Sequence, residues 1–440
     1  MMSEYDILVI GAGLAGVTAA RECSARGLRV VILEGRDRIG GRAWTIEMDN
    51  GEKADIGGTF FSWNQPHYWA EITRYGLADE VVDAVHDPFE WACTPKGGEL
   101  VWSTVDEHIE REMPLLESFF EPSYEALPRP YNPLYNEEAI AKIDHMTVQD
   151  RIDELGLSKD DSDLLATLMT TFAGAGPDEV SYVAMLRWWA TAGHNYIEYY
   201  SDLQNSKLKR GQESLVQAIL DDSGAELRLS TPVTAVKSDE NGASVTLANG
   251  EVLTGKAVVV ATPSGVWPYL DFDPPLAADK SEATKESLQI PRGGKTVGVI
   301  RGESRVFAIT PLPGHPITAI FTTYKRSEDE QLVTVFSGPA MKDPEDQAEV
   351  AAAIRDLLPN AELIEMHSSL YDTDDEFTRG AWSVHKAGQL TKFQPHTKLA
   401  ESEGRVVFAT ADIASLWPSF LDGAIETGLR AGREVKRILG

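Results

Sequence analysis

Cysteine is scarce in this chain of 440 residues, which contains only Cys23 and Cys93. Two cysteines cannot form a disulfide framework or the paired Cys-x-x-Cys spacing of a zinc site, so no metal site is predicted. Cys23 falls on the apolar face of an expected helix, where packing is its expected role. The low cysteine content favours a reduced, cytoplasmic compartment.

Long apolar runs and basic charge are lacking as well. No run of about 18 apolar residues occurs, which predicts a chain without a transmembrane helix. Glu4 and Asp6 precede the first apolar run, where a secretory signal would carry basic residues. The net charge of −29 argues against nucleic acid or an anionic membrane surface as a partner. Solubility is the simplest reason for this charge.

The first 34 residues contain the most regular pattern of the chain. An apolar run at 5–10 is followed by the turn GAGLAG at 11–16, a helical stretch that stops at Gly27, and a second apolar run that ends on Glu34. This is a βαβ unit of about 30 residues, as in Rossmann-like folds. The length of the chain exceeds what one hydrophobic core usually fills, which predicts two domains.

The glycines of this turn have the G-x-G-x-x-G spacing of a dinucleotide site. Gly11 permits the tight turn, Gly13 lets a pyrophosphate approach the backbone, and Gly16 lets helix and strand pack closely. The N-terminus of the helix offers N–H donors to the phosphates. Glu34 would accept from both ribose hydroxyls and repel a 2′-phosphate. A glycine-rich turn without a ligand is the less favoured interpretation.

Further elements follow from the spacing of apolar residues. Four prolines at 122–136 predict a loop or a lid. Asn249-Gly250 predicts a hairpin turn between two strands. Helical patterns recur at 66–77, 147–157, 182–193 and 345–358, and strand patterns at 225–263, 295–301 and 332–336. The helix at 182–193 contains Trp188 and Trp189. Both side chains are expected to pack in a helical core, and a position in the wall of a pocket is the less favoured alternative.

Two more glycine pairs narrow the choice of dinucleotide. EGRDRIGGRAWT at 34–45 contains one pair followed by Arg42, and DIGGTFF at 55–61 contains another. With these motifs the chain resembles the flavin-dependent amine oxidase family, which includes the monoamine oxidases. The C-terminal stretch RVVFATADIASLWPSFLDGAIETGLRAG at 405–432 is similar to that family's closing strand and helix. The resemblance implies bound FAD.

In that family the glycine-rich loops lie against the flavin, and the closing helix points its N-terminus at it. The resemblance implies that Arg42 and Asp412 lie near the diphosphate and that the Val233 backbone lies near the adenine. The cofactor-binding residues expected from the dinucleotide motif and from the resemblance are Gly11, Gly13, Ala15, Gly16, Glu34, Gly35, Arg36, Gly40, Gly41, Arg42, Ala43, Gly57, Gly58, Thr59, Val233, Ala261, Asp412, Leu421 and Ala424.

A single lysine opens an apolar run in PRGGKTVGVI at 291–300. Two glycines, which are expected to loosen the chain, precede Lys295. The resemblance implies that Lys295 is the family's lysine that reaches a water bound to flavin N5, where its charge state would be tuned by burial. A solvated strand end is the alternative.

An aromatic cage is the last element that the resemblance implies. Trp382 in TRGAWSVHKAG at 378–388 and Phe420 resemble its two walls, which would attract an amine and strip its water. Phe420 stands where a tyrosine is commonest in the family. Ala381 precedes Trp382 where members with covalent flavin carry a cysteine, which implies noncovalent FAD. Core packing is the alternative for both rings.

These observations predict a two-domain α/β flavoprotein with an α+β substrate domain. The Rossmann-like FAD-binding domain is expected to be discontinuous in sequence, comprising 1–77, 208–285 and 389–440. The substrate-binding domain is expected to comprise 78–207 and 286–388.

The expected function is an FAD-dependent amine oxidase whose small-molecule substrates are a primary or secondary amine and O2. The amine would be oxidised to the imine and O2 reduced to hydrogen peroxide. A flavoenzyme that is reduced by a nicotinamide cofactor would usually contain a second G-x-G-x-x-G motif, and none follows the first one here. The electrons are therefore expected to come from the organic substrate. Alternatives are an L-amino-acid oxidase, with Arg187 as a carboxylate-binding residue, a flavin desaturase or dehydrogenase with a non-oxygen acceptor, and a non-catalytic flavoprotein. A homodimer is left open.

Overall fold

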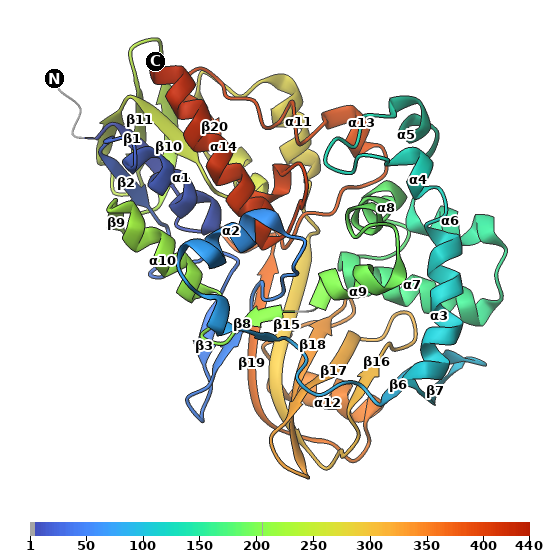
Figure 1. Cartoon of the computed structure of the whole chain (residues 1–440). Helices are drawn as coiled ribbons and strands as arrows, with labels where there is room; N and C mark the ends of the chain where they lie inside the picture. The colour runs from blue at the N-terminus through green and yellow to red at the C-terminus, as the bar shows by residue number, and fades with distance from the viewer. Residues whose placement is uncertain (1–4, 205) are drawn as a thin grey trace.

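The computed structural model describes residues 5–204 and 206–440, with the backbone alone for 201–204, so Glu4 lies outside the described residues. The chain forms two domains, as predicted. Figure 1 shows both chain ends in the domain that contains β1 and α14, while a second sheet and a group of helices form the other domain. The predicted two-domain α/β architecture is confirmed.

A parallel sheet forms the centre of the first domain. Its strand order is β20 (Val406–Phe408), β13 (Ala257–Val260), β1 (Ile7–Ile10), β2 (Val30–Leu33) and β9 (Glu226–Arg228). All four pairings are parallel, and those of β1 with β13, β13 with β20 and β2 with β9 join stretches of chain far apart in sequence. The strands β1, β2 and β13 are buried on both faces, which explains their continuous apolar runs.

Layers on both faces cover this sheet. Ile7 and Val9 of β1 pack in one core with the helices α1 (Leu14–Ser24), α10 (Glu213–Ser223) and α14 (Leu421–Leu439). Alternate residues of the same strand face a core shared with a second, four-stranded sheet. That sheet has the order β12 (Val252–Gly255), β11 (Ala243–Leu247), β10 (Val233–Ser238) and β14 (Asp271–Asp273). The predicted Asn249-Gly250 turn joins β11 to β12, with Gly250 at φ 86°.

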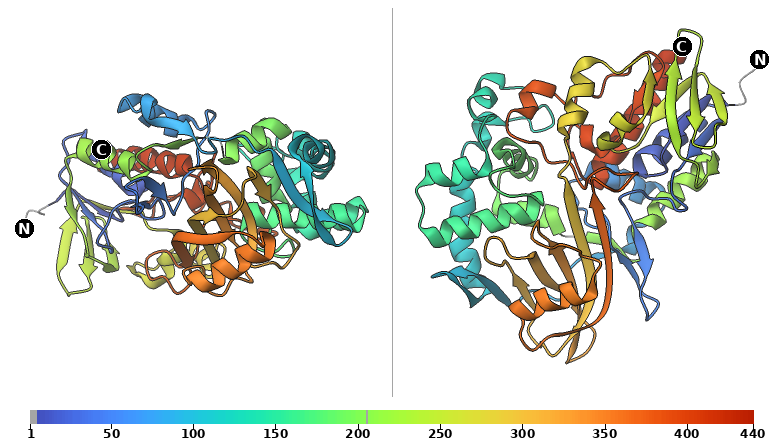
Figure 2. Two further views of the ribbon diagram at one scale, coloured as in Figure 1. Left: turned by 90° about the horizontal axis from the view of Figure 1, so that it is seen from below. Right: turned by 180° about the vertical axis from the view of Figure 1, so that it is seen from behind.

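A seven-stranded sheet forms the base of the second domain. Its order is β19 (Glu362–Asp372), β15 (Arg292–Arg301), β18 (Glu330–Ser337), β17 (Ile317–Lys325), β16 (Phe307–Ile309), β6 (Trp91–Lys96) and β7 (Glu99–Thr104). The helix α12 (Gln347–Leu357) packs on this sheet. Both views of Figure 2 place the orange helix α12 against these strands.

Helices complete the second domain and build a separate core. They are α3 (Val105–Phe119), α4 (Ser123–Ala126), α5 (Glu137–Ile143), α6 (Val148–Leu155), α7 (Lys159–Ala173), α8 (Tyr182–Thr191) and α9 (Tyr196–Gln204). The remaining elements are β3 (Thr45–Glu47), β4 (Lys53–Asp55), α2 (Pro66–Arg74), β5 (Val81–Asp83), β8 (Ser206–Leu208), α11 (Ala278–Glu286), α13 (Gln389–Phe393) and the short helices η1 (Ala78–Glu80), η2 (Ser264–Tyr269) and η3 (Ala411–Ile413).

Two local predictions need correction. The loop predicted at 122–136 contains the short helix α4 before its turns begin. Gly293 and Gly294 do not loosen the chain, because they are paired within the ladders of β15 with β18 and β19. A Cβ at Gly293 would lie 2.5 Å from the ring of Trp382, so this glycine allows a close approach.

Among the helices of the described residues, none combines the length and the apolar character that a membrane span requires.

Candidate functional site

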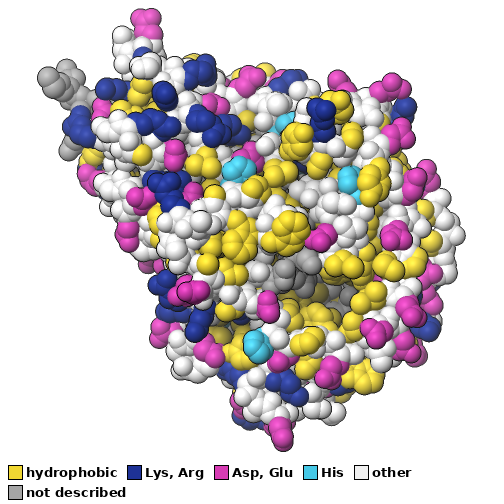
Figure 3. All heavy atoms as spheres, in the orientation of Figure 1, with side chains coloured by type: hydrophobic (Ala, Val, Ile, Leu, Met, Phe, Trp, Pro, Cys, Tyr) yellow, Lys and Arg dark blue, Asp and Glu magenta, His cyan; other side chains and the backbone are white. Residues whose placement is uncertain are grey.

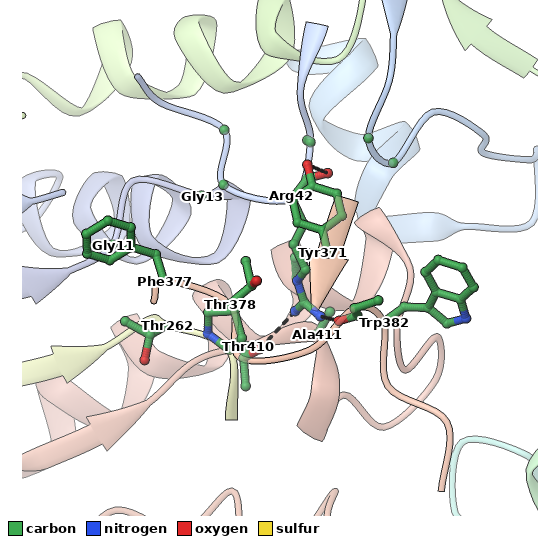
Figure 4. Close-up of a pocket in the computed structure, with 18 of the residues that line it drawn as sticks. Gly11, Gly13, Arg42, Thr262, Tyr371, Phe377, Thr378, Trp382, Thr410 and Ala411 are labelled. Carbon is green, nitrogen blue, oxygen red and sulfur yellow. Dashed lines mark hydrogen bonds between the residues drawn. The ribbon is translucent and has the colours of Figure 1, made fainter. Parts of the chain in front are cut away.

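A cavity of about 570 Å³ is lined by residues of both domains. In Figure 4, Gly11, Thr262 and Phe377 lie on one side of it and Trp382 on the other, with Arg42 and Tyr371 between them. We call these the glycine-turn end and the aromatic end. The space-filling view in Figure 3 shows hydrophobic side chains gathered around a hollow on one face of the molecule.

Most of the residues predicted to bind the cofactor line this cavity, and only Gly16 and Asp412 do not. Those in the lining are Gly11, Gly13, Ala15, Glu34, Gly35, Arg36, Gly40, Gly41, Arg42, Ala43, Gly57, Gly58, Thr59, Val233, Ala261, Leu421 and Ala424. Lys295, Trp382 and Phe420 line it too. The sequence therefore identified residues from both domains that the fold brings to one cavity.

The glycine turn is shaped by close main-chain packing. Gly11 has φ +103°, a conformation that favours glycine, and its N–H donates to the Leu33 carbonyl at 2.8 Å. A Cβ at Gly16 would lie 1.9 Å from the Gly11 carbonyl oxygen, so Gly16 allows the helix to pack against the turn, as predicted. A Cβ at Gly13 would meet only the Gly40 carbonyl oxygen at 3.7 Å.

Main-chain donors hold the Glu34 carboxylate at the glycine-turn end. It accepts from the Ala12 N–H at 2.7 Å and from the Arg36 N–H at 2.9 Å, and it is buried. The bond from Ala12 brings it to the start of α1, where the helix N-terminus presents positive partial charge. A buried carboxylate in this position can accept hydrogen bonds from a pair of sugar hydroxyls.

Two hydroxyls at this end fit a ligand rich in polar groups. The Oγ1 atoms of Thr262 and Thr378 are buried, line the cavity and have no hydrogen-bond partner among the described residues. Buried polar atoms in native proteins are normally hydrogen-bonded, so both point to a bound group with donors or acceptors. The glycine turn, the Glu34 carboxylate and these two hydroxyls together fit FAD. Thr378 begins the stretch TRGAWSVHKAG, but no pattern in the sequence marks either threonine as a residue that faces a ligand.

Arg42 lies between the two ends. Its guanidinium donates to the Asp412 carboxylate at 2.9 Å, to the Ala381 carbonyl at 3.0 Å and to the Thr410 hydroxyl at 3.4 Å. The same Asp412 carboxylate accepts from the N–H and hydroxyl of Ser264, at 2.8 and 2.9 Å. Asp412 thus positions Arg42 from behind, which explains why it does not line the cavity.

Lys295 is buried, so the interpretation as a solvated strand end is wrong. Its Nζ donates to the main-chain carbonyls of Asp55 at 2.8 Å and Gly57 at 3.2 Å, and it contacts the Thr59 hydroxyl. Desolvation by burial lowers the pKa of Lys295 to about 7, with the Asp55 carboxylate opposing this shift and Lys207 adding to it. The amine can therefore exchange a proton near neutral pH.

The ring of Trp382 is held rigidly at the aromatic end. Its Nε1 donates to the Ala173 carbonyl at 3.1 Å. A Cβ at Gly174 would lie 2.4 Å from the indole and one at Gly293 would lie 2.5 Å from it, so the ring lies directly on two glycines. Because neither backbone leaves room, Trp382 forms a wall that cannot retreat.

Tryptophan rings hold Phe420 in place. The ring centroids of Trp188 and Phe420 are 5.4 Å apart with an interplanar angle of 79°, and those of Trp417 and Phe420 are 5.1 Å apart at 72°. Both are edge-to-face contacts. Trp188 lines the cavity, whereas a core position was the favoured prediction and a pocket wall the alternative. Trp189 packs in the core as predicted, stacked on Phe120 at 4.8 Å.

Other aromatic residues at the cavity were missed by the sequence analysis. They include Phe172 and Phe336, which share no motif with the cage. For Trp188, the sequence does contain one signal, the concentration of large side chains at 182–193.

This signal does not show whether Trp188 or Trp189 faces a cavity. The answer depends on how α8 packs against Phe420, which is more than 200 residues away in the sequence.

Comparisons with known proteins agree with this geometry. Residues 14–436 match the model of a family described as flavin containing amine oxidoreductase. Nicotine dehydrogenase of Pseudomonas putida is 34% identical over 99% of this chain and 89% of its own length. Pseudooxynicotine dehydrogenase of Pseudomonas sp is 32% identical over 99% of this chain and 87% of its own. A putrescine oxidase variant with redesigned cofactor binding has a solved structure with a TM-score of 0.83 at 19% identity, covering 98% of this chain and 99% of that one.

Two alanine substitutions should separate folding from cofactor binding in the glycine turn. Gly16→Ala should lower the free energy of unfolding by about 2–3 kcal/mol, because its methyl overlaps a backbone oxygen. Gly13→Ala should change the stability of the apoprotein by less than about 0.5 kcal/mol, since its methyl has room. It should weaken FAD binding at least about tenfold, because it separates the phosphates from donors worth about 1.5–3 kcal/mol each. Urea unfolding and FAD titration measure both; equal loss of stability in the two variants would contradict this assignment.

The Lys295 amine should titrate near pH 7 in the protein with FAD bound. The amine is positively charged below this pH and neutral above it. The change in charge near the flavin should alter the flavin absorbance in a single-proton transition, and Lys295→Met should abolish this transition. Lys207→Gln should move the transition to higher pH, because it removes a repelling charge, and Asp55→Asn should move it to lower pH. Identical pH-difference spectra of the parent and Lys295→Met would show that this amine does not titrate there.

Proposed function

The chain belongs to the family of flavin-containing amine oxidoreductases, and within it we propose that this protein oxidises an apolar primary or secondary amine to the imine. FAD, when bound, takes up the hydride equivalent from the carbon next to the amine nitrogen. The observation that carries the proposal is the aromatic end, where Trp382 and Phe420 lie in one cavity with the buried Lys295. The imine would leave and hydrolyse to an aldehyde or ketone.

The aromatic end is suited to a neutral amine. Its walls replace the water around the substrate, and desolvation disfavours the ammonium form. An amine that binds without its proton has a free lone pair, so no side chain is needed as a general base. The Thr171 hydroxyl, which lines the cavity, already has two acceptors for its single proton, the carbonyls of Thr167 at 3.0 Å and Thr318 at 2.9 Å. The substrate is therefore held by apolar surface.

An L-amino-acid oxidase is the weaker alternative. The Arg187 guanidinium donates to the main-chain carbonyls of Pro130, at 3.3 Å, and Ser415, and it is absent from the described cavity lining. Arg42, which does line the cavity, is bonded to Asp412. Neither arginine offers a free guanidinium for a substrate carboxylate, so turnover of α-amino acids is not expected.

We propose that the flavin is bound without a covalent link. Ala381 lies where a cysteine would have to stand, and the side chains of Cys23 and Cys93 are buried outside the described lining. Acid precipitation of the purified protein should leave the polypeptide colourless and all of the flavin in the supernatant. Yellow colour that stays with the precipitate would show a covalent link.

Oxygen is the proposed electron acceptor, with hydrogen peroxide as product. A dehydrogenase with another acceptor is the second candidate, because the relatives at 32% and 34% identity are both named dehydrogenases. We further propose that residues 1–77, 208–285 and 389–440 form the FAD-binding domain and the remainder the substrate-binding domain. Cytoplasmic location and a homodimer stay predictions.

One panel assay tests the activity and the acceptor together. It contains primary amines, secondary amines including pseudooxynicotine, the tertiary amine nicotine, diamines, and L-α-amino acids. Each compound is tested in air for peroxide and without oxygen with an artificial electron acceptor. Turnover of apolar amines with L-α-amino acids inert is expected. Peroxide would support the oxidase, and turnover confined to the artificial acceptor would support the dehydrogenase. Turnover of α-amino acids alone would contradict the proposed function.

A further inference from the structure

Three consecutive residues of α8 have three different surroundings. Arg187 bonds main-chain carbonyls of the segments at Pro130 and Ser415. Trp189 lies in the helical core, stacked on Phe120 with an interplanar angle of 19°. Trp188 faces the cavity. The direction of each side chain is fixed by contacts on both of its neighbours, so the Trp188 indole has little freedom to turn away from the cavity.

Phe420 depends on Trp188 for its position. The ring lies between the edges of Trp188 and Trp417, and Trp417 is completely buried with no place in the described lining. Phe420 therefore cannot move back toward Trp417. On the side of the cavity, Trp188 is the ring in contact with Phe420.

The opposite wall offers no extra room. Trp382 lies on Gly174 and Gly293 and is held by the Ala173 carbonyl. A substrate that is too wide for the gap between Trp382 and Phe420 cannot push Trp382 aside, because the atoms behind it are backbone. Toward Trp188, in contrast, the size of the site is set by a side chain, which a substitution can change.

We propose that Trp188 forms a third wall of the amine site and determines how large an apolar substituent the substrate amine can carry. This inference rests on the proposed function, since it concerns the same site. It assigns the substrate class more narrowly, as amines with a flat apolar substituent that lies against the Trp188 indole. Trp188 is a specificity-determining residue because it would contact the substituent and not the reacting carbon.

The test compares a slim and a bulky aromatic amine, benzylamine and 2-naphthylmethylamine, on the holoenzyme. The variants are Trp188→Ala and the milder Trp188→Phe, and the matched control is Trp189→Phe, which changes the adjacent ring in the core. FAD content and unfolding temperature are measured for each. The readout is the ratio of kcat/KM for the bulky amine to kcat/KM for the slim one.

Trp188→Ala should raise this ratio about tenfold or more, the usual effect of changing an apolar pocket by a large group. The change should appear mainly in KM, because the reacting carbon is unaffected. Trp188→Phe should give a smaller increase, and Trp189→Phe should leave the ratio within about twofold of the parent, as for a residue that does not contact the substrate. A ratio that stays the same in both Trp188→Ala and Trp188→Phe, whether or not the two kcat/KM values fall together, would overturn the assignment of Trp188.

The activity of the parent protein tests the proposed function independently of the variants. A parent that oxidises at least one of the two amines supports the proposed function whatever the variants do. A parent that oxidises no amine, in air or with an artificial acceptor, would refute the proposed function and the assignment of Trp188 along with it.

Discussion

The burial of one lysine amine ties the two domains together at the cavity. Because a buried amine needs hydrogen-bond acceptors, Lys295 of β15 must lie against the carbonyls of Asp55 and Gly57, which follow the glycine-rich part of the chain. A neighbouring strand repeats this link, since the hydroxyl of Ser369 donates to the Ile56 carbonyl. Polar contacts between the segment at 55–57 and the strands β15 and β19 thus hold the two domains together beside the cavity.

The two ends of the cavity differ in chemistry because they arise from different kinds of packing. The glycine-turn end is built from main-chain groups and from Glu34, which suits a ligand with phosphates and sugar hydroxyls. The aromatic end is built from rings that hold one another in place. Arg42 separates the ends, and its bonds to Asp412 and Ala381 fix the segment that presents Trp382. One elongated site can therefore bind a charged cofactor beside an apolar substrate.

Sequence predicted what local rules determine. The glycine turn and Glu34 belong to one βαβ unit, so their spacing was sufficient to place them together. Lys295, Trp382 and Phe420 came from the family resemblance, and the structure brings them to the same cavity. The roles of Gly293 and Trp188 were not predictable, because each depends on a ring contributed by a distant segment. From the sequence alone, a pair of glycines before an apolar run predicts a flexible segment. Only the structure shows that the indole of Trp382 lies where a side chain at Gly293 would be.

The central claim is that an amine held at the aromatic end transfers its electrons to FAD in the same cavity. The most direct measurement is rapid mixing of the purified holoenzyme with an apolar amine in the absence of oxygen. The account predicts loss of the oxidised-flavin absorbance at a rate that saturates with amine concentration, and a much lower rate in Trp382→Ala. A flavin that stays oxidised with every amine of the panel, in a protein that retains its full FAD content, would contradict it.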